Sequence, residues 1–144
     1  MENKIKILVV DDSEPTRKFI GSILSRDGYN VDYAENGITA LEKLFISKYD
    51  IVITDINMPG MDGFELIVKL RKDEMYKNTP IVLLTTESSV ESIEQGIKIG
   101  ADLYLIKPTS PDKIRYSIKE MAKRIKKEWY LCFLKKIMNS MMHF

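Results

Sequence analysis

Short apolar runs that alternate with helical patterns constrain the fold of this chain more than any other feature. The apolar runs are Ile5–Val10, Val31–Ala34, Ile51–Thr54, Ile81–Leu84 and Leu103–Ile106. Each is followed by a segment whose apolar residues recur every three or four positions, as on one face of a helix. These segments are Thr16–Arg26, Ile38–Ile46, Phe64–Leu70, Val90–Ile99 and the stretch from Asp112 onward. Five strand–helix units with right-handed crossovers predict a three-layer α/β/α sandwich around a parallel sheet.

Local signals agree with this division. The first, third and fourth runs lack polar alternation, which is typical of strands buried on both faces of a parallel sheet. Asp62 with Glu65, and Ser88 with Glu91, have the spacing of capping boxes, so we expect helices to start after Asp62 and Ser88. Pro111 suits the first position of the last helix.

Composition and charge exclude several classes of protein. With 144 residues, of which 44% are hydrophobic, the chain is long enough for one domain with a real core. The 22 Lys and Arg residues balance 21 Asp and Glu residues, which argues against a broad nucleic-acid footprint. Cys132 is the only cysteine, so no intrachain disulfide forms. Because no apolar run reaches membrane-spanning length and no signal-peptide pattern opens the chain, we expect a cytoplasmic protein without a membrane span.

Charged residues stand where three of the predicted strands end. Asp11 and Asp12 follow the first run, Asp55 follows the third, and Lys107 follows the fifth. The carboxyl ends of parallel strands line the ligand crevice of such folds, so these side chains are expected to meet. Three gathered carboxylates repel one another unless they share a cation. Mg²⁺ prefers oxygen ligands and often bridges to phosphate, so the sequence predicts a site for Mg²⁺ and a phosphoryl group.

Asp55 has the position of a nucleophile within this predicted site. A carboxylate there can attack phosphorus and form an aspartyl phosphate, while the main-chain carbonyl of Asn57 can reach the metal. Thr85 ends the fourth strand and can donate its hydroxyl to a phosphoryl oxygen. Lys107 ends an apolar strand and needs a partner, which the carboxylates supply. Taken singly, the acidic pair also suits a helix start and Thr85 suits any strand, so only the combination points to this chemistry.

The same motifs resemble the receiver domain of two-component response regulators, of the single-domain chemotaxis type, over roughly residues 4–126. They are Asp11-Asp12, Asp55, Met58-Pro59-Gly60, Asp62-Gly63, Thr85 and Lys107-Pro108. The resemblance implies a flavodoxin-like sheet of five parallel strands in the order 2-1-3-4-5, with five helices. It also implies a receiver domain at 1–127, a C-terminal helical extension at 128–144, and no separate output domain.

By position, the resemblance implies that Asp55 accepts a phosphoryl group from a histidine kinase. It implies Mg²⁺ bound directly by Asp12, Asp55 and the carbonyl of Asn57, with Asp11 acting through water. The further implied roles are phosphate binding by Lys107, switching by Thr85 and Tyr104, and modulation of the reaction by Asn57, Thr86 and Glu87. The chain would then be no enzyme beyond gaining and losing its own phosphoryl group. It would switch the binding of a downstream target protein through the fourth helix, fifth strand and fifth helix.

Two other functions stay open. One is a phosphohydrolase that forms an aspartyl phosphate, as in the haloacid dehalogenase superfamily. Those enzymes carry a second Asp two residues after the nucleophile, where this chain has Asn57. The other is a structural dimer that uses the fold without phosphorylation, against which the complete set of motif residues argues.

The segment 128–144 (EWYLCFLKKIMNSMMHF) lies beyond the resemblance. Its apolar residues recur at helical spacing, which predicts that the last helix continues with a broad apolar stripe that needs a partner. Four partners stay open: the chain's own domain, a second copy in a homodimer, a downstream protein, and a membrane surface. Only Lys135 and Lys136 add positive charge within the segment, which weighs against the membrane. His143, the only histidine, is expected to be solvated.

Overall fold

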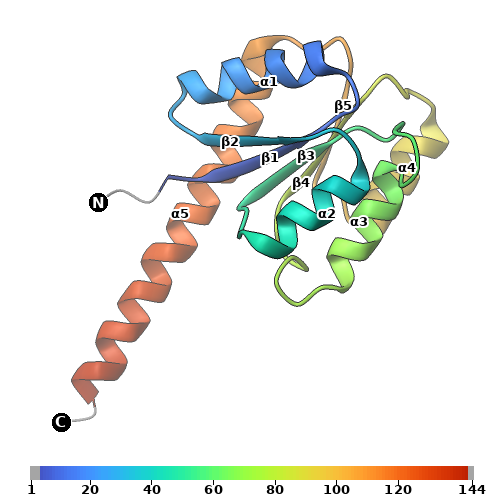
Figure 1. Cartoon of the computed structure of the whole chain (residues 1–144). Helices are drawn as coiled ribbons and strands as arrows, with labels where there is room; N and C mark the ends of the chain where they lie inside the picture. Colours follow the sequence, from blue (N-terminus) through green and yellow to red (C-terminus); the bar gives the residue numbers. More distant parts are fainter. Residues whose placement is uncertain (1–3, 143–144) are drawn as a thin grey trace.

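Five parallel strands form the centre of the computed structural model, which describes residues 4–142 (Figure 1). The strands are β1 (Lys6–Val10), β2 (Asn30–Ala34), β3 (Ile51–Thr54), β4 (Ile81–Thr85) and β5 (Leu103–Ile106). The helices are α1 (Glu14–Arg26), α2 (Gly37–Ile46), α3 (Gly63–Lys72), α4 (Val90–Ile99) and α5 (Pro111–Met142). Every strand and helix predicted from the sequence is confirmed, with starts and strand ends within two residues of the prediction.

The strand order is β2-β1-β3-β4-β5, as predicted. Helices α1 and α5 cover one face of the sheet, and α2, α3 and α4 cover the other (Figure 1). The chain therefore leaves β1 toward one face and β3 toward the opposite face. Adjacent parallel strands that diverge in this way open a crevice at their carboxyl ends. The topology thus places the ends of β1 and β3 at the mouth of one cleft.

Helix starts follow the capping rules, with one correction to the sequence prediction. Asp62 caps α3 as expected, because its side chain accepts a hydrogen bond from the main-chain N–H of Glu65 at 2.8 Å. The expectation that Ser88 caps α4 is wrong. The cap is Ser89, whose hydroxyl accepts from the N–H of Ser92 at 3.2 Å. The capping residue stands directly before the first helical residue, and α4 begins at Val90.

Helix α5 belongs to the domain only in its first half. Five of its side chains are buried against the sheet and α1: Ile114, Ile118, Met121, Ala122 and Ile125. From residue 126 to Met142 none is buried, and the helix continues away from the domain (Figure 1). The predicted helical extension is therefore present, and through Met142 it does not fold back onto its own domain. His143 lies outside the described residues.

No helix in the described part of the chain is both long enough and apolar enough to span a membrane.

Candidate functional site

Three acidic side chains converge in the crevice where β1 and β3 end. Asp11 directly follows β1 and is buried, Asp12 next to it is exposed, and Asp55 directly follows β3 and is buried. One carboxylate oxygen from each lies within 4.8 Å of the others. The meeting of these side chains, predicted from strand topology, is confirmed. Three oxygen donors this close suit a hard divalent cation of the Mg²⁺ or Ca²⁺ type.

Lys107 supplies the positive charge in the crevice. Its Nζ lies 2.7 Å from Asp11 Oδ2 and 3.1 Å from Asp55 Oδ2. Burial disfavours the charged ammonium, but hydrogen bonds and attraction from the two carboxylates outweigh it and raise the pKa of Lys107. Lys107 therefore stays protonated and holds two carboxylates that would otherwise repel each other.

Main-chain groups fix the carboxylate of Asp55. Its Oδ1 accepts hydrogen bonds from the N–H groups of Ile56, at 2.6 Å, and Asn57, at 3.4 Å. Its Oδ2 faces Lys107. The loop after β3 also packs closely against Asp55, because a Cβ added at Gly63 would fall 2.0 Å from the Asp55 carbonyl oxygen. A glycine at 63 is thus required for the loop to hold Asp55 in this position.

Asp11 is held by the start of α1. Its Oδ1 accepts from the N–H of Ser13 at 2.9 Å, and Ser13 caps the helix. Arg17 donates from Nη1 to the main-chain oxygen of Asp11 at 2.6 Å. Arg17 was not predicted as a site residue, although its position one turn into α1 is a signal, because a side chain there points back toward the loop that precedes the helix.

Glu87 connects the loops that follow β3 and β4. Its Oε1 accepts from Asn57 Nδ2 at 3.0 Å, and its N–H donates to Thr85 Oγ1 at 3.3 Å. Thr85 is fully buried at the end of β4, while Thr86 beside it is exposed. Asn57, Thr85 and Glu87 are therefore linked by hydrogen bonds, and Thr86 lies between the last two in the sequence.

Tyr104 extends this group to β5 and α4. Its hydroxyl donates to the main-chain oxygen of Glu87 at 2.8 Å. A Cβ on Gly96 would approach the Tyr104 ring to 3.1 Å, so the ring packs closely against α4. Burial raises the pKa of Tyr104, and the charges of Glu87 and Asp55 add to the rise. The ring is therefore half-buried between α4 and the β4–α4 loop instead of lying free on the surface.

The chain resembles known proteins over most of its length. The response regulator receiver domain matches residues 7–119. The transcriptional regulatory protein ResD of Bacillus subtilis is 37% identical over 128 residues, 89% of this chain, and the chain spans only about half (52%) of ResD. The chemotaxis protein CheY1 of Helicobacter pylori is 41% identical over 113 residues, which cover 77% of this chain and 91% of CheY1. The similarity thus covers nearly the whole of CheY1 and about half of ResD.

A solved structure adds a chemical detail. The response regulator TrrA of Thermotoga maritima, in complex with Mg²⁺ and BeF, superposes with a TM-score of 0.73 at 38% sequence identity. The comparison covers 81% of this chain and 98% of TrrA.

Proposed function

The chain belongs to the response regulator receiver domain family, and from this premise we propose that it is a signalling module controlled by phosphorylation of Asp55. In this proposal a histidine kinase donates the phosphoryl group, and the phosphorylated form changes its binding of a downstream target protein. The observation that carries the proposal is the joint placement of Asp11, Asp55 and Lys107 within hydrogen-bond distance in the crevice.

The proposed reaction is a phosphoryl transfer between two side chains. A carboxylate oxygen of Asp55 forms a bond to phosphorus. The bond from phosphorus to the imidazole nitrogen of the kinase's phosphohistidine breaks, and its electron pair stays on that nitrogen, which then takes a proton. Water later attacks phosphorus and releases inorganic phosphate, which restores the Asp55 carboxylate. The chain catalyses only these two events on itself.

The donor set supports Mg²⁺ as the cofactor. The roles proposed for the site residues are Asp12, Asp55 and the Asn57 carbonyl as direct ligands, and Asp11 as a ligand through water. Bound there, the cation supplies positive charge that offsets the charge of carboxylate and phosphoryl oxygens in the transition state. Lys107 acts alongside it, since its ammonium already contacts Asp55. The TrrA complex, which contains both Mg²⁺ and BeF, supports this assignment because beryllofluoride mimics an aspartyl phosphate.

The proposed switch starts from charge. Phosphorylation adds about −1.5 to −2 charges at Asp55 at neutral pH. The hydroxyl of Thr85 is drawn toward the phosphoryl oxygens, which requires it to give up the hydrogen bond that it accepts from Glu87. Tyr104 donates a hydrogen bond to the main-chain oxygen of the same Glu87. A movement of Glu87 would therefore shift Tyr104 and alter α4, β5 and α5, the proposed output face.

Asn57, Thr86 and Glu87 are proposed to set the rates of phosphoryl gain and loss. Thr86 is larger than the Ala or Gly that the family usually has there, and it is exposed beside the crevice. We expect Thr86→Ala to react faster in both directions, because less bulk stands next to the phosphoryl group. Equal rates for the variant and the natural chain would contradict this role for Thr86.

The test of the proposal is phosphorylation by a small phosphodonor. The natural chain, incubated with phosphoramidate or acetyl phosphate and Mg²⁺, is expected to gain one phosphoryl group by intact mass. Asp55→Asn is expected to gain none, and removal of Mg²⁺ with EDTA is expected to prevent the reaction. Asp62→Asn is the matched control, because it makes the same change in the same loop and asparagine still caps α3. Modification that persists in Asp55→Asn, or sustained turnover of p-nitrophenyl phosphate, would overturn the proposal.

A further inference from the structure

Helix α5 carries two opposite faces, which its buried residues define. Ile114, Ile118 and Ile125 point into the domain. At about 100° per residue, the opposite half of the helix can be followed along its whole length. We call this half the outer face. Within 111–127 its charged residues are the exposed Lys113, Lys119, Lys123, Arg124, Lys126 and Lys127, together with two acids, Asp112 and Glu120. Within 128–142 it contains Tyr130, Leu131, Leu134, Ile137, Met138, Met141 and Met142, and Phe133 lies at its border.

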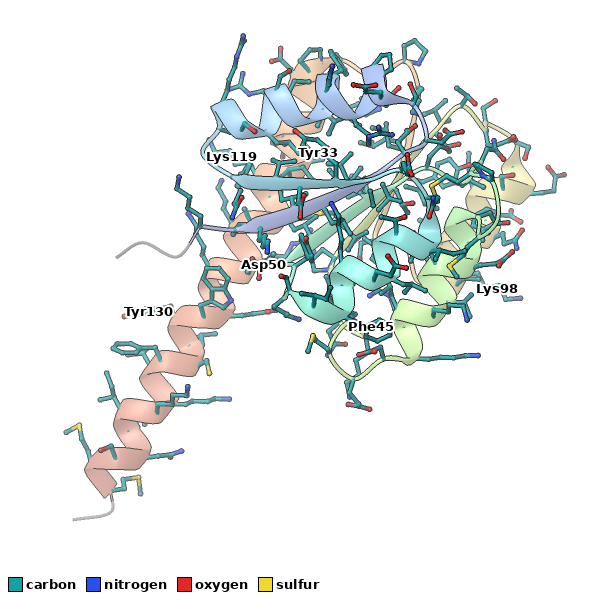
Figure 2. All side chains as sticks on the ribbon, in the orientation of Figure 1. Tyr33, Phe45, Asp50, Lys98, Lys119 and Tyr130 are labelled. Atoms are coloured by element: carbon teal, nitrogen blue, oxygen red, sulfur yellow. The ribbon has the colours of Figure 1, made fainter. Side chains whose placement is uncertain are left out.

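The outer face is therefore basic beside the domain and apolar beyond it. Seven of the eight apolar side chains are exposed and Leu134 is half-buried, with Met138 60% and Met141 69% exposed. Figure 2 shows side chains standing out along this part of α5, with Tyr130 labelled near its start. The polar residues of the extension, Lys135, Lys136 and Asn139, fall on the other half of the helix.

The basic part of the outer face is a local excess that the whole chain conceals. Between residues 111 and 127 helix α5 contains seven Lys and Arg residues and two Asp and Glu residues, although the whole chain has a net charge of only +1. Two of the basic residues have acidic partners, since Arg115 pairs with Asp27 at 3.0 Å and Lys123 with Glu120 at 3.3 Å. Within residues 4–142 no ion pair is found for Lys113, Lys119, Arg124, Lys126 or Lys127.

From this arrangement we propose that the outer face of α5 binds the surface of a membrane that contains anionic lipids. The apolar side chains of the extension enter the boundary between headgroups and acyl chains, and the lysines and arginines of the preceding turns contact anionic headgroups. Helices that lie in this plane bury their apolar face roughly 5–10 Å deep. The domain faces away from such a surface, because its contacts with α5 are on the opposite half of the helix.

The charge pattern favours a lipid surface over a second copy of the chain. Two extensions paired in parallel would bring the basic parts of both outer faces together, and like charges would repel. An antiparallel pair would avoid this repulsion but leave the unpaired lysines without partners. An anionic surface uses both parts of the outer face at once. Tyr130 and Phe133 stand where the basic part gives way to the apolar part, a place that aromatic side chains favour at membrane–water interfaces.

Vesicle flotation with the full chain tests this proposal. We expect binding to vesicles of phosphatidylcholine and phosphatidylglycerol (3:1), binding at least tenfold weaker to pure phosphatidylcholine, and a steep loss of affinity with added salt. Each basic residue next to an anionic surface is worth about fivefold in affinity. Replacing Lys119, Lys126 and Lys127 together by Gln should therefore weaken binding about a hundredfold.

A matched pair of substitutions separates the two halves of the extension. Ile137→Glu places a charge on the outer face, and Asn139→Glu places the same charge on the other half. Ile137→Glu should abolish flotation, while Asn139→Glu should stay within about fivefold of the natural chain. Both positions are exposed, so the domain should unfold at an unchanged temperature in both variants. Equal effects of the two substitutions, or no flotation with anionic vesicles at low salt, would overturn the proposal.

Self-association with a second copy of the chain is the alternative that can be measured directly. Sedimentation velocity without vesicles is expected to give a monomer at micromolar concentration. A stable dimer that Ile137→Glu dissociates, and that does not float with anionic vesicles, would assign the apolar face to self-association and overturn the membrane proposal.

Discussion

Charged side chains at the two edges of the sheet are arranged in opposite ways. At the edge where the strands begin, each acidic side chain accepts hydrogen bonds from its own donors and shares none with another acid. Asp50 accepts from the N–H of Lys6 at 2.8 Å, and Asp102 accepts from the N–H of Ile81 at 2.8 Å and from Arg71 at 3.0 Å. At the edge where the strands end, Asp11 and Asp55 face each other and share Lys107. The acids at the first edge have their hydrogen-bond donors within the fold. The second edge retains an excess of negative charge, because two carboxylates share one lysine.

Two partly buried cations, Arg71 and Lys107, reflect the same difference. Arg71 donates to Asp102 and also to four main-chain carbonyl oxygens, those of Gly100, Tyr76, Lys77 and Thr79. Burial lowers the pKa of Arg71, and attraction to Asp102 opposes the shift without cancelling it. For Lys107 two carboxylates outweigh burial and the pKa rises. Arg71 has one carboxylate and four neutral carbonyl oxygens as acceptors, an arrangement that stabilises the fold. Lys107 balances an excess of carboxylates, which is typical of a functional site.

The largest effect is expected when Arg71 is removed. Arg71→Ala leaves several carbonyl oxygens without this donor and removes one of the two donors to Asp102, so we expect a loss of about 3 kcal/mol in the free energy of unfolding. Urea unfolding measures this loss, and added Mg²⁺ should not restore it. Lys72→Ala, at the exposed neighbouring position, should change stability by less than about 0.5 kcal/mol. Recovery of Arg71→Ala with Mg²⁺ would break the contrast between the two edges.

Lys107→Met tests the other cation. It leaves Asp11 and Asp55 facing each other without positive charge, so without metal we expect a loss of about 2 kcal/mol. A divalent cation that binds only the folded chain should restore much of it, since binding stabilises the native state by mass action. Urea unfolding with and without Mg²⁺ should therefore show a larger stabilisation by the metal in Lys107→Met than in the natural chain. Lys113→Met serves as the control, because Lys113 is exposed.

The same contrast explains how far the sequence could predict the molecule. The crevice could be predicted from the sequence, because Asp11, Asp55 and Lys107 each follow an apolar strand and parallel topology brings the strand ends together. The hydrogen bonds of Arg71 could not be predicted, because most of its acceptors are main-chain oxygens, which every residue type carries. The basic part of α5 was not predicted from the sequence, because the net charge of the whole chain is near zero. It emerges only when the buried side of the helix is known, because that side defines the outer face.

Asp55 and Asp102 should respond to the same substitution with opposite signs. Asp102→Asn weakens an acceptor that two donors use, so we expect a loss of about 1.5 kcal/mol. Asp55→Asn removes one of two carboxylates that share a lysine, so without Mg²⁺ we expect a gain of about 1 kcal/mol. Thermal unfolding in EDTA compares the two variants. A loss at both positions would mean that Asp55 is as much a structural acid as Asp102.

The smallest effect concerns an acid outside the crevice. Asp32 accepts from the hydroxyl of Tyr49 at 2.6 Å, from the N–H of Tyr33 and from Lys43. Burial raises its pKa, but these hydrogen bonds and Lys43 outweigh burial, so the pKa lies below the 3.8 of an unperturbed aspartate. A lowered folded-state pKa stabilises the fold at pH values above the unfolded pKa, and the stabilisation is lost as the pH falls through the folded value.

Because the Asp32 side chain is 42% exposed, solvent screening limits this stabilisation to less than about 1 kcal/mol. The difference in unfolding free energy between the natural chain and Asp32→Asn isolates it from the other carboxyl groups. That difference should be largest at neutral pH and should shrink below pH 3.8, where Asp32 takes up its proton. The same difference at both pH values would show that the carboxylate charge of Asp32 adds nothing. In that case, having its own hydrogen-bond donors would not distinguish a structural carboxylate from the carboxylates of the crevice.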